Sequence, residues 1–93
     1  MAIEFDPAKD ALNVANHGIS LEKAEELLSG FTIEFEDDRF DYGETRIVAA
    51  GEIAGCIFVC VYTMRGENYR PISLRPAKRK ERNAYYQAKA SRA

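Results

Sequence analysis

The chain has 93 residues, of which 46% are hydrophobic and 30% charged, and these proportions are typical of one globular domain spanning residues 1–93. They exclude a disordered or fibrous protein, and the longest apolar run, 53–62, is about half the length of a membrane-spanning helix. The net charge of −2 argues against a uniformly basic surface, and the N-terminus has no basic segment followed by an apolar stretch, so a cytoplasmic protein is predicted.

Two short helices are predicted within the first thirty residues. Asp6 caps the first helix, and Pro7 occupies its first position, where a proline loses nothing by lacking an N–H group. Gly18 ends this helix, Ser20 caps the second helix, and Gly30 ends the second. Apolar residues recur at helical spacing at Ala8, Ala11, Leu12 and Ala15, and then at Leu21, Ala24, Leu27 and Leu28.

Four strands and a final helix are predicted in the remainder of the chain. Apolar and polar residues alternate strictly over 31–36, which is typical of a strand with one buried face. The further strand candidates are 46–50, 56–63 and 69–74. Their connectors are short and contain glycine, as hairpins require, and a last helix starts at Pro76 and Ala77. The predicted fold class is therefore α+β, with two N-terminal helices, a four-stranded antiparallel meander sheet and a C-terminal helix.

The third predicted strand contains both cysteines of the chain. Its segment 56–62 is apolar at both alternating positions, so we expect it to lie centrally with both faces covered. Cys56 and Cys60 point the same way and stand about 13 Å apart at strand rise, too far for a disulfide. They lack the further Cys or His ligands that a zinc site requires. They are interpreted as structural core residues, and no metal or other cofactor is predicted.

Charge is divided unevenly along the chain. Residues 1–50 contain 4 basic and 12 acidic side chains, a net charge of −8, whereas residues 51–93 contain 9 basic and 3 acidic side chains, a net charge of +6. Four basic residues occupy the start of the final helix, where the helix dipole prefers anions: Lys78, Arg79, Lys80 and Arg82. With free N–H groups beside them they indicate a phosphate site. The alternative is a solvated helix end with a little strain.

Three arginines lie in or at the ends of predicted strands, at Arg46, Arg70 and Arg75. Gathered on one face of the sheet, they would offer planar, bidentate donors for a phosphodiester. They could equally pair with Glu44, Glu81 or the acidic loop, and the sequence does not separate these cases. Their convergence beside the start of the final helix is an expectation for the structure.

His17 is the only histidine and a candidate general base near neutral pH. Its place before the helix-ending glycine also suits a structural role, because this end of the helix dipole favours an imidazolium and the ring can bond a terminal carbonyl. A divalent ion could be attracted by the acidic residues Glu34, Glu36, Asp37 and Asp38. Their alternation and their position in a loop favour a solvated patch instead.

Short motifs follow one another in a specific order along nearly the whole chain. The first are Phe5-Asp6-Pro7-Ala8-Lys9, Asn13 and His17-Gly18-Ile19-Ser20-Leu21. The later ones are Arg46 with Ala49 and Gly51, Val61-Tyr62-Thr63, Arg70 with Ile72-Ser73 and Arg75, and Lys80-Glu81-Arg82 with Tyr85. In this order and spacing the chain resembles the BrnT family of type II toxins. Pro71 departs from the family pattern and removes a ladder donor, so its strand is expected at a sheet edge or bulged there.

The resemblance implies a RelE-like fold and a ribonuclease that arrests translation. The implied cleavage is independent of metal: a ribose 2′-OH attacks the neighbouring phosphate and leaves a 2′,3′-cyclic phosphate and a 5′-OH. The resemblance also implies neutralisation by BrnA, a ribbon–helix–helix antitoxin that binds operator DNA, in a complex with two toxins. The alternative is a non-catalytic module that binds nucleic acid or the antitoxin.

The resemblance also implies roles for individual residues. Arg46 and Arg75 would bind the reacting phosphate, and Lys9, His17 or Glu81 would transfer protons. With the basic start of the final helix added, the RNA-binding residues would be Arg70, Lys78, Arg79, Arg82 and Tyr85. Tyr85 or Tyr86 would stack a base, with packing of the helix on the sheet as the alternative for either.

Overall fold

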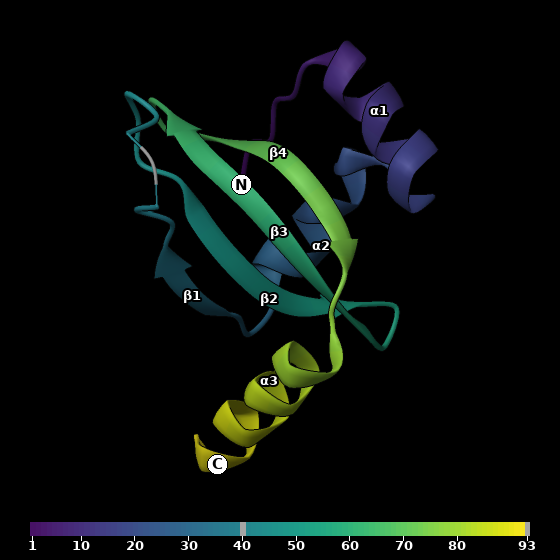
Figure 1. Cartoon of the computed structure of the whole chain (residues 1–93), viewed down its shortest axis with the longest axis vertical. Helices are drawn as coiled ribbons and strands as arrows, with labels where there is room; N and C mark the ends of the chain where they lie inside the picture. The colour runs from purple at the N-terminus through teal and green to yellow at the C-terminus, as the bar shows by residue number, and fades with distance from the viewer. Residues whose placement is uncertain (40, 93) are drawn as a thin grey trace.

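The computed structural model describes residues 1–39 and 41–92, and its elements follow the predicted order (Figure 1). The helical elements are α1 (Pro7–His17), the short 3-10 helix η1 (Leu21–Lys23), α2 (Ala24–Ser29) and α3 (Arg79–Ser91). The strands are β1 (Ile33–Glu36), β2 (Ile47–Ile53), β3 (Cys56–Arg65) and β4 (Asn68–Pro76). This architecture confirms the α+β prediction. Among the residues described, none of the helices is long and apolar enough to cross a membrane.

The four strands form one antiparallel sheet in the order β1-β2-β3-β4, which confirms the predicted meander and places β3 inside the sheet. β2, β3 and β4 are longer than predicted, so the two hairpins turn on two residues each, Ala54–Gly55 and Gly66–Glu67. The first of these turns has positive φ at both residues, 51° and 81°, as a type I′ turn requires. β4 also extends further than predicted, so α3 begins at Arg79 rather than at Pro76–Ala77.

Pro71 lies in β4, which is the last strand of the sheet, and the pairing of β3 with β4 is irregular beside it. Val61 pairs with Ser73 whereas Tyr62 pairs with Pro71, so Ile72 is left over as a bulge. Both expectations for this proline, an edge position and a bulge, are confirmed. A residue without an N–H group cannot donate the backbone hydrogen bond that a central strand needs on each side.

Helices cover both faces of the sheet. η1 and α2 cover one face, where Leu21 and Leu27 pack with Cys60 and Leu74 in the larger core cluster, and α1 runs along β4. α3 packs on the opposite face, which we call the α3 face, over Val59 and its neighbours. Figure 1 shows α2 behind the sheet and α3 at its lower end. Because side chains alternate, the position of a residue along its strand decides which layer it joins.

The two cysteines have different environments. Cys60 is fully buried in the larger core cluster, where desolvation raises the pKa of its thiol to about 12. Cys56 is exposed at the first position of β3, directly after the hairpin turn. The prediction of a core cysteine is therefore confirmed for Cys60 and wrong for Cys56.

α1 packs on the sheet with a polar residue. The predicted apolar positions Ala8, Ala11, Leu12 and Ala15 are all exposed, and Leu12 retains 63% of its accessible surface. The buried residue of α1 is Asn13, whose amide nitrogen donates to the carbonyls of Leu74 and Ile19 at 2.8 Å each. Its amide oxygen accepts the Leu74 N–H at 3.0 Å. Asn13 therefore pairs with the edge of β4 as a neighbouring strand would, and it holds α1 there.

We predict that Asn13→Ala lowers the free energy of unfolding by about 3 kcal/mol, because a buried backbone N–H and two carbonyls lose their partner. Urea denaturation followed by far-UV circular dichroism measures the loss. Asn16→Ala, in the same helix but exposed, is the matched control and should change stability by less than about 0.5 kcal/mol. Equal stability of the two variants would contradict the role assigned to Asn13.

Candidate functional site

Arg46, Arg70 and Arg75 lie on the same face of the sheet. Arg70 pairs with Thr63 and Arg75 with Val59 across β3 and β4, and Val59 belongs to the cluster under α3. Arg46 precedes β2 by one residue, and its carbonyl accepts a backbone N–H from the residue after β1 at 2.8 Å, so the alternation of β2 continues to it. The three side chains therefore rise from the α3 face.

The three arginines do not meet at one point of that face. Thr63 and Val59 are four residues apart in β3, so Arg75 lies about 13 Å along the sheet from Arg70. Thr63 of β3 lies between Arg46 and Arg70 in the sheet. The two arginines are therefore two strand spacings apart, roughly 10 Å. Only Arg75 lies beside the start of α3, so the expected convergence of all three at that point is wrong.

Arg46 and Arg70 each have a carboxylate partner. Arg46 Nη2 lies 3.6 Å from Glu44, and its guanidinium stacks 3.9 Å from the centre of the Tyr42 ring. The Nε atom of Arg46 is buried and has no hydrogen-bond partner among the described residues. Arg70 lies 3.9 Å from Glu4, which follows a backbone bridge between the N-terminal segment and β4. At these distances the two pairs are loose, and a phosphate can compete for both guanidinium groups.

The closest of the three pairs joins Arg75 to Glu81 of α3. The two guanidinium Nη atoms donate to the two carboxylate oxygens at 2.8 Å each, and Glu81 Oε1 also accepts the Lys78 N–H at 2.7 Å. Glu81 therefore caps α3 while it binds Arg75. The hydrogen bonds from Arg75, with that from Lys78, lower the pKa of Glu81 to about 2. Glu81 is thus an ionised but weak proton acceptor as long as the pair is intact.

A groove of about 640 Å³ opens beside this pair on the α3 face, and we call it the central groove. Val48, Val61 and Ser73 form its floor, the Arg75–Glu81 pair forms one side, and residues 35–39 form the other. Its two sides come from segments far apart in the sequence, residues 35–39 and the end of β4 with the start of α3.

The Asp37 carboxylate in the wall of the central groove organises the loop after β1. It accepts hydrogen bonds from Arg39 Nε at 2.9 Å and Nη2 at 3.0 Å, and from the Tyr42 hydroxyl at 3.1 Å. The bonds from Arg39 are the main reason that the pKa of Asp37 falls to about 2. Asp37 is therefore not part of a solvated patch, as its place in the acidic run had suggested. An Asp two residues before an Arg is the sequence signal, because such an Asp can also accept that residue's N–H, here at 3.3 Å.

The acidic run does not form a cation site in the described part of the chain. No three potential metal-ligating side chains are grouped closely enough there to hold an ion. Glu34 is engaged elsewhere, since its two carboxylate oxygens accept hydrogen bonds from Tyr62 at 2.9 Å and from Thr32 at 2.7 Å.

A second groove, of about 210 Å³, lies between α1 and β4, and we call it the α1 groove. Lys9 and His17 line it from α1, and Ser73 lines it from β4. Ser73 also lines the central groove, so the two grooves meet at this residue. The His17 side chain is exposed and makes no hydrogen bond to a described residue, whereas the Gly18 N–H donates to the Val14 carbonyl and closes the helix. The alternative in which the His17 ring bonds a terminal carbonyl is therefore not observed.

The start of α3 has cations without carboxylate partners. Lys78, Arg79 and Lys80 are exposed, and no described acidic side chain lies within ion-pair distance of them. Arg82 donates from Nη1 to the Ala77 carbonyl at 2.8 Å and also lacks an acidic partner there. Together with Arg75 they gather positive charge where β4 leads into α3, although only Arg75 of the five lines the central groove.

Tyr85, predicted to bind RNA, is instead a core residue. Its side chain is fully buried, its hydroxyl donates to Glu52 at 2.8 Å, and its ring packs 5.6 Å from that of Phe31. No face of the ring is open to a base, so the prediction of RNA contact is wrong for Tyr85 and its packing alternative holds. Tyr86, the next residue, retains 50% of its accessible surface.

Comparison with known proteins places this geometry in context. The model of a family described as the ribonuclease toxin BrnT of type II toxin–antitoxin systems matches residues 5–81. The matched region starts just before α1 and ends at Glu81, so it includes the residues that line both grooves from α1 to the start of α3. No curated protein matches the chain.

We predict that Glu81→Gln destabilises the protein by about 1 kcal/mol at pH 7 and has almost no effect near pH 2. A carboxyl whose pKa falls on folding stabilises the folded state above its ordinary value of 4.5 and loses that contribution as the pH approaches 2. The glutamine amide oxygen still accepts the Lys78 N–H, so the variant removes charge and keeps the cap. Urea denaturation at pH 7, 4 and 2.5 measures the effect, with Glu67→Gln in an exposed turn as the control. A pH-independent loss would rule out the ion pair as its cause.

Proposed function

The chain belongs to the family of BrnT ribonuclease toxins of type II toxin–antitoxin systems, and on this basis we propose that it cleaves RNA and thereby arrests translation in the cytoplasm. In the proposed reaction, which uses no metal, a ribose 2′-OH loses its proton and attacks the neighbouring phosphorus. The O5′ atom of the next nucleotide leaves with a proton. The products are a 2′,3′-cyclic phosphate and a 5′-OH. The proposed partner is a BrnA-like ribbon–helix–helix antitoxin that binds operator DNA and two toxins.

The observation that carries this proposal is the junction of the two grooves at Ser73. Lys9 and His17 lie on one side of it, and Arg75 and Glu81 lie on the other. The chemistry needs a proton acceptor, a proton donor and a cation around one phosphate. Of the five residues for which the family resemblance implies a catalytic role, four therefore line one of two grooves that share Ser73, whereas the fifth, Arg46, lies outside both linings.

A phosphate bound beside Ser73, where the two grooves meet, would replace Glu81 as the partner of Arg75. Arg75 presents two parallel donors, the arrangement that suits a phosphate as well as a carboxylate. Since the bonds from Arg75 are the main cause of the low pKa of Glu81, their transfer to phosphate lets that pKa rise. Glu81 then becomes a better proton acceptor when substrate is bound. His17 and Lys9, which line the α1 groove, remain the other candidates for proton transfer.

The remaining basic residues would bind the flanking RNA. Arg46 and Arg70 lie farther along the α3 face and would contact phosphates away from the cleaved bond. The exposed cations at the start of α3, Lys78 and Arg79 with Arg82 behind them, would attract the backbone on the other side. Tyr86 replaces its buried neighbour as the tyrosine proposed to stack a base.

One observation favours a second candidate, a non-catalytic module that binds nucleic acid or the antitoxin. All three strand arginines have carboxylate partners, so none is free for a phosphate before that partner is displaced. Such a module would bind RNA in a salt-sensitive manner and would release no cyclic phosphate. Analysis of the RNA ends after incubation with the purified chain separates the two candidates.

We predict that expression of the wild-type chain stops growth and lowers bulk protein synthesis, and that Arg75→Ala relieves the arrest. Loss of two donors to the reacting phosphate should lower the cleavage rate about a hundredfold or more. The measurement is the yield of 2′,3′-cyclic phosphate ends from a defined RNA, alongside growth curves.

Lys23→Ala is the matched control, because it removes a cation from η1 on the opposite face of the sheet and should leave both readouts unchanged. Wild-type expression that leaves growth and RNA intact would count against a toxin, and full activity of Arg75→Ala would remove this residue from the proposed site.

A further inference from the structure

β1 is a free edge of the sheet. It stands at the end of the strand order, pairs with β2 on its inner side, and has no strand on its outer side among the residues described. An unpaired edge offers backbone N–H and C=O groups to an added strand, and proteins normally protect such edges. β1 is short, but it carries Phe35, the most exposed large apolar side chain of the described chain. Phe35 retains 65% of its accessible surface.

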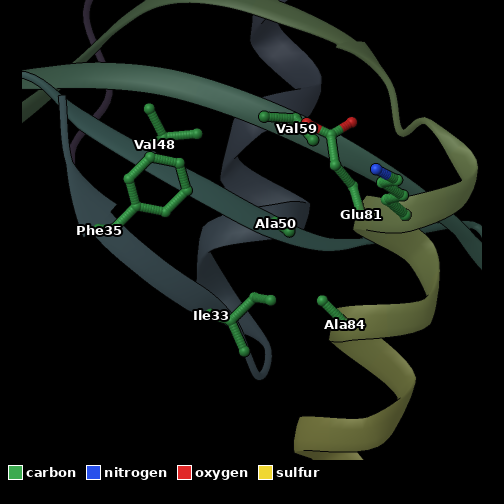
Figure 2. A pocket seen from close by; sticks show the side chains of 8 residues that line it. Ile33, Phe35, Val48, Ala50, Val59, Glu81 and Ala84 are labelled. Carbon is green, nitrogen blue, oxygen red and sulfur yellow. The ribbon is translucent and has the colours of Figure 1, made fainter. Parts of the chain in front are cut away.

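An apolar cleft of about 190 Å³ adjoins Phe35 between β1 and α3. Figure 2 shows Ile33 and Phe35 of β1 on one side of it, with Val48 beside Phe35, and Ala84 of α3 on the other side, with Ala50 between them. Six of its eight lining residues are apolar, and the charged ones, Lys80 and Glu81, both belong to α3, so water against β1 and β2 finds few hydrogen-bond partners. An exposed aromatic ring beside an apolar hollow is typical of a surface that another protein covers.

The charge at the β1 side of this cleft is negative, whereas Lys80 lines its α3 side. Glu36 and Asp38 line the adjoining central groove, and neither side-chain carboxylate has a hydrogen bond or ion pair with a described residue. The guanidinium groups of that groove are already engaged, one by Asp37 and the other by Glu81. The unbalanced charge at the β1 side therefore repels a polyanion and attracts a basic partner.

We propose that the outer edge of β1, the apolar cleft and the two carboxylates beyond it form the docking surface for the antitoxin. The antitoxin would contribute an extended basic segment that pairs with β1, places an apolar side chain in the cleft and sets a lysine or arginine against Glu36 and Asp38. This inference rests on the proposed function for the existence of an antitoxin. Phe35, Val48 and Glu81 line both the cleft and the central groove, so a segment bound there covers one end of the candidate site.

The test uses the full-length chain and the antitoxin encoded with it, purified separately, with affinity measured by isothermal titration calorimetry. Phe35→Ser should weaken binding at least tenfold, and the double variant Glu36→Lys/Asp38→Lys should do the same at low salt and less at high salt. Hydrogen exchange of the wild-type complex should show new protection of the β1 amides. Thermal unfolding establishes that each variant is folded, which its exposed position favours.

Matched controls lie on the opposite side of the molecule. Met64→Ser replaces another exposed apolar residue of the sheet, and Glu22→Lys/Glu25→Lys reverses two exposed acids beside α2. Both should change the affinity less than twofold. Absence of binding by the wild-type chain, or unchanged affinity of the Phe35 and double variants, overturns the proposal.

Two further outcomes would assign the surface to another occupant and also overturn the proposal. In the first, the Phe35 variant and the double variant bind the antitoxin as the wild type does but no longer bind a non-cleavable 2′-deoxy oligonucleotide. In the second, they bind the antitoxin as the wild type does but no longer self-associate. Failure of the proposed function is seen separately, as absence of cyclic-phosphate ends with the wild-type chain, so either idea can fail alone.

Discussion

The double hydrogen bond between Arg75 and Glu81 joins the last strand to the last helix, and the geometry of the candidate site depends on it. The residue before Arg75, Leu74, uses its backbone to hold α1 through Asn13. Two consecutive residues of β4 therefore attach the helical elements on both sides of this strand. The distance from the α1 groove to the Arg75–Glu81 pair is consequently defined by one short piece of backbone, which is the rigid support that a site built from several elements requires.

Pairing within the fold redistributes the charge of the chain. The acidic first half and the basic second half do not form two separate surfaces, because Glu4 of the first half pairs with Arg70 of β4, and Glu44 pairs with Arg46 within the first half. What remains unpaired among the described residues is more informative. Cations gather at the start of α3, and the free carboxylates Glu36 and Asp38 lie at the opposite side of the central groove. The α3 side of this region is thus suited to a phosphate, and the β1 side to a basic protein segment.

Local sequence signals were sufficient for most of the architecture. The cap at Asp6, the αL glycine Gly18 and the alternation of the strands each depend on a few neighbouring residues, and the corresponding elements were predicted. The same holds for Pro71, because a missing N–H group has the same consequence in any sheet. The helical period of α1 was also right, yet its buried face was not, since the periodicity of apolar residues does not include a polar side chain that pairs with a strand edge.

For the candidate site, the sequence by itself determined which groups are available: the arginines, the only histidine, the acidic loop and the basic start of the last helix. The tertiary structure alone decided their partners and their exposure. It buried Tyr85 and left Phe35 at the surface, locked Asp37 to Arg39, and brought Lys9 and His17 to the other side of Ser73 from Arg75. The physical reason is that a short-range rule acts on residues near in the chain, whereas pairing and burial depend on the registers of β2, β3 and β4 and on the side of the sheet that each helix covers.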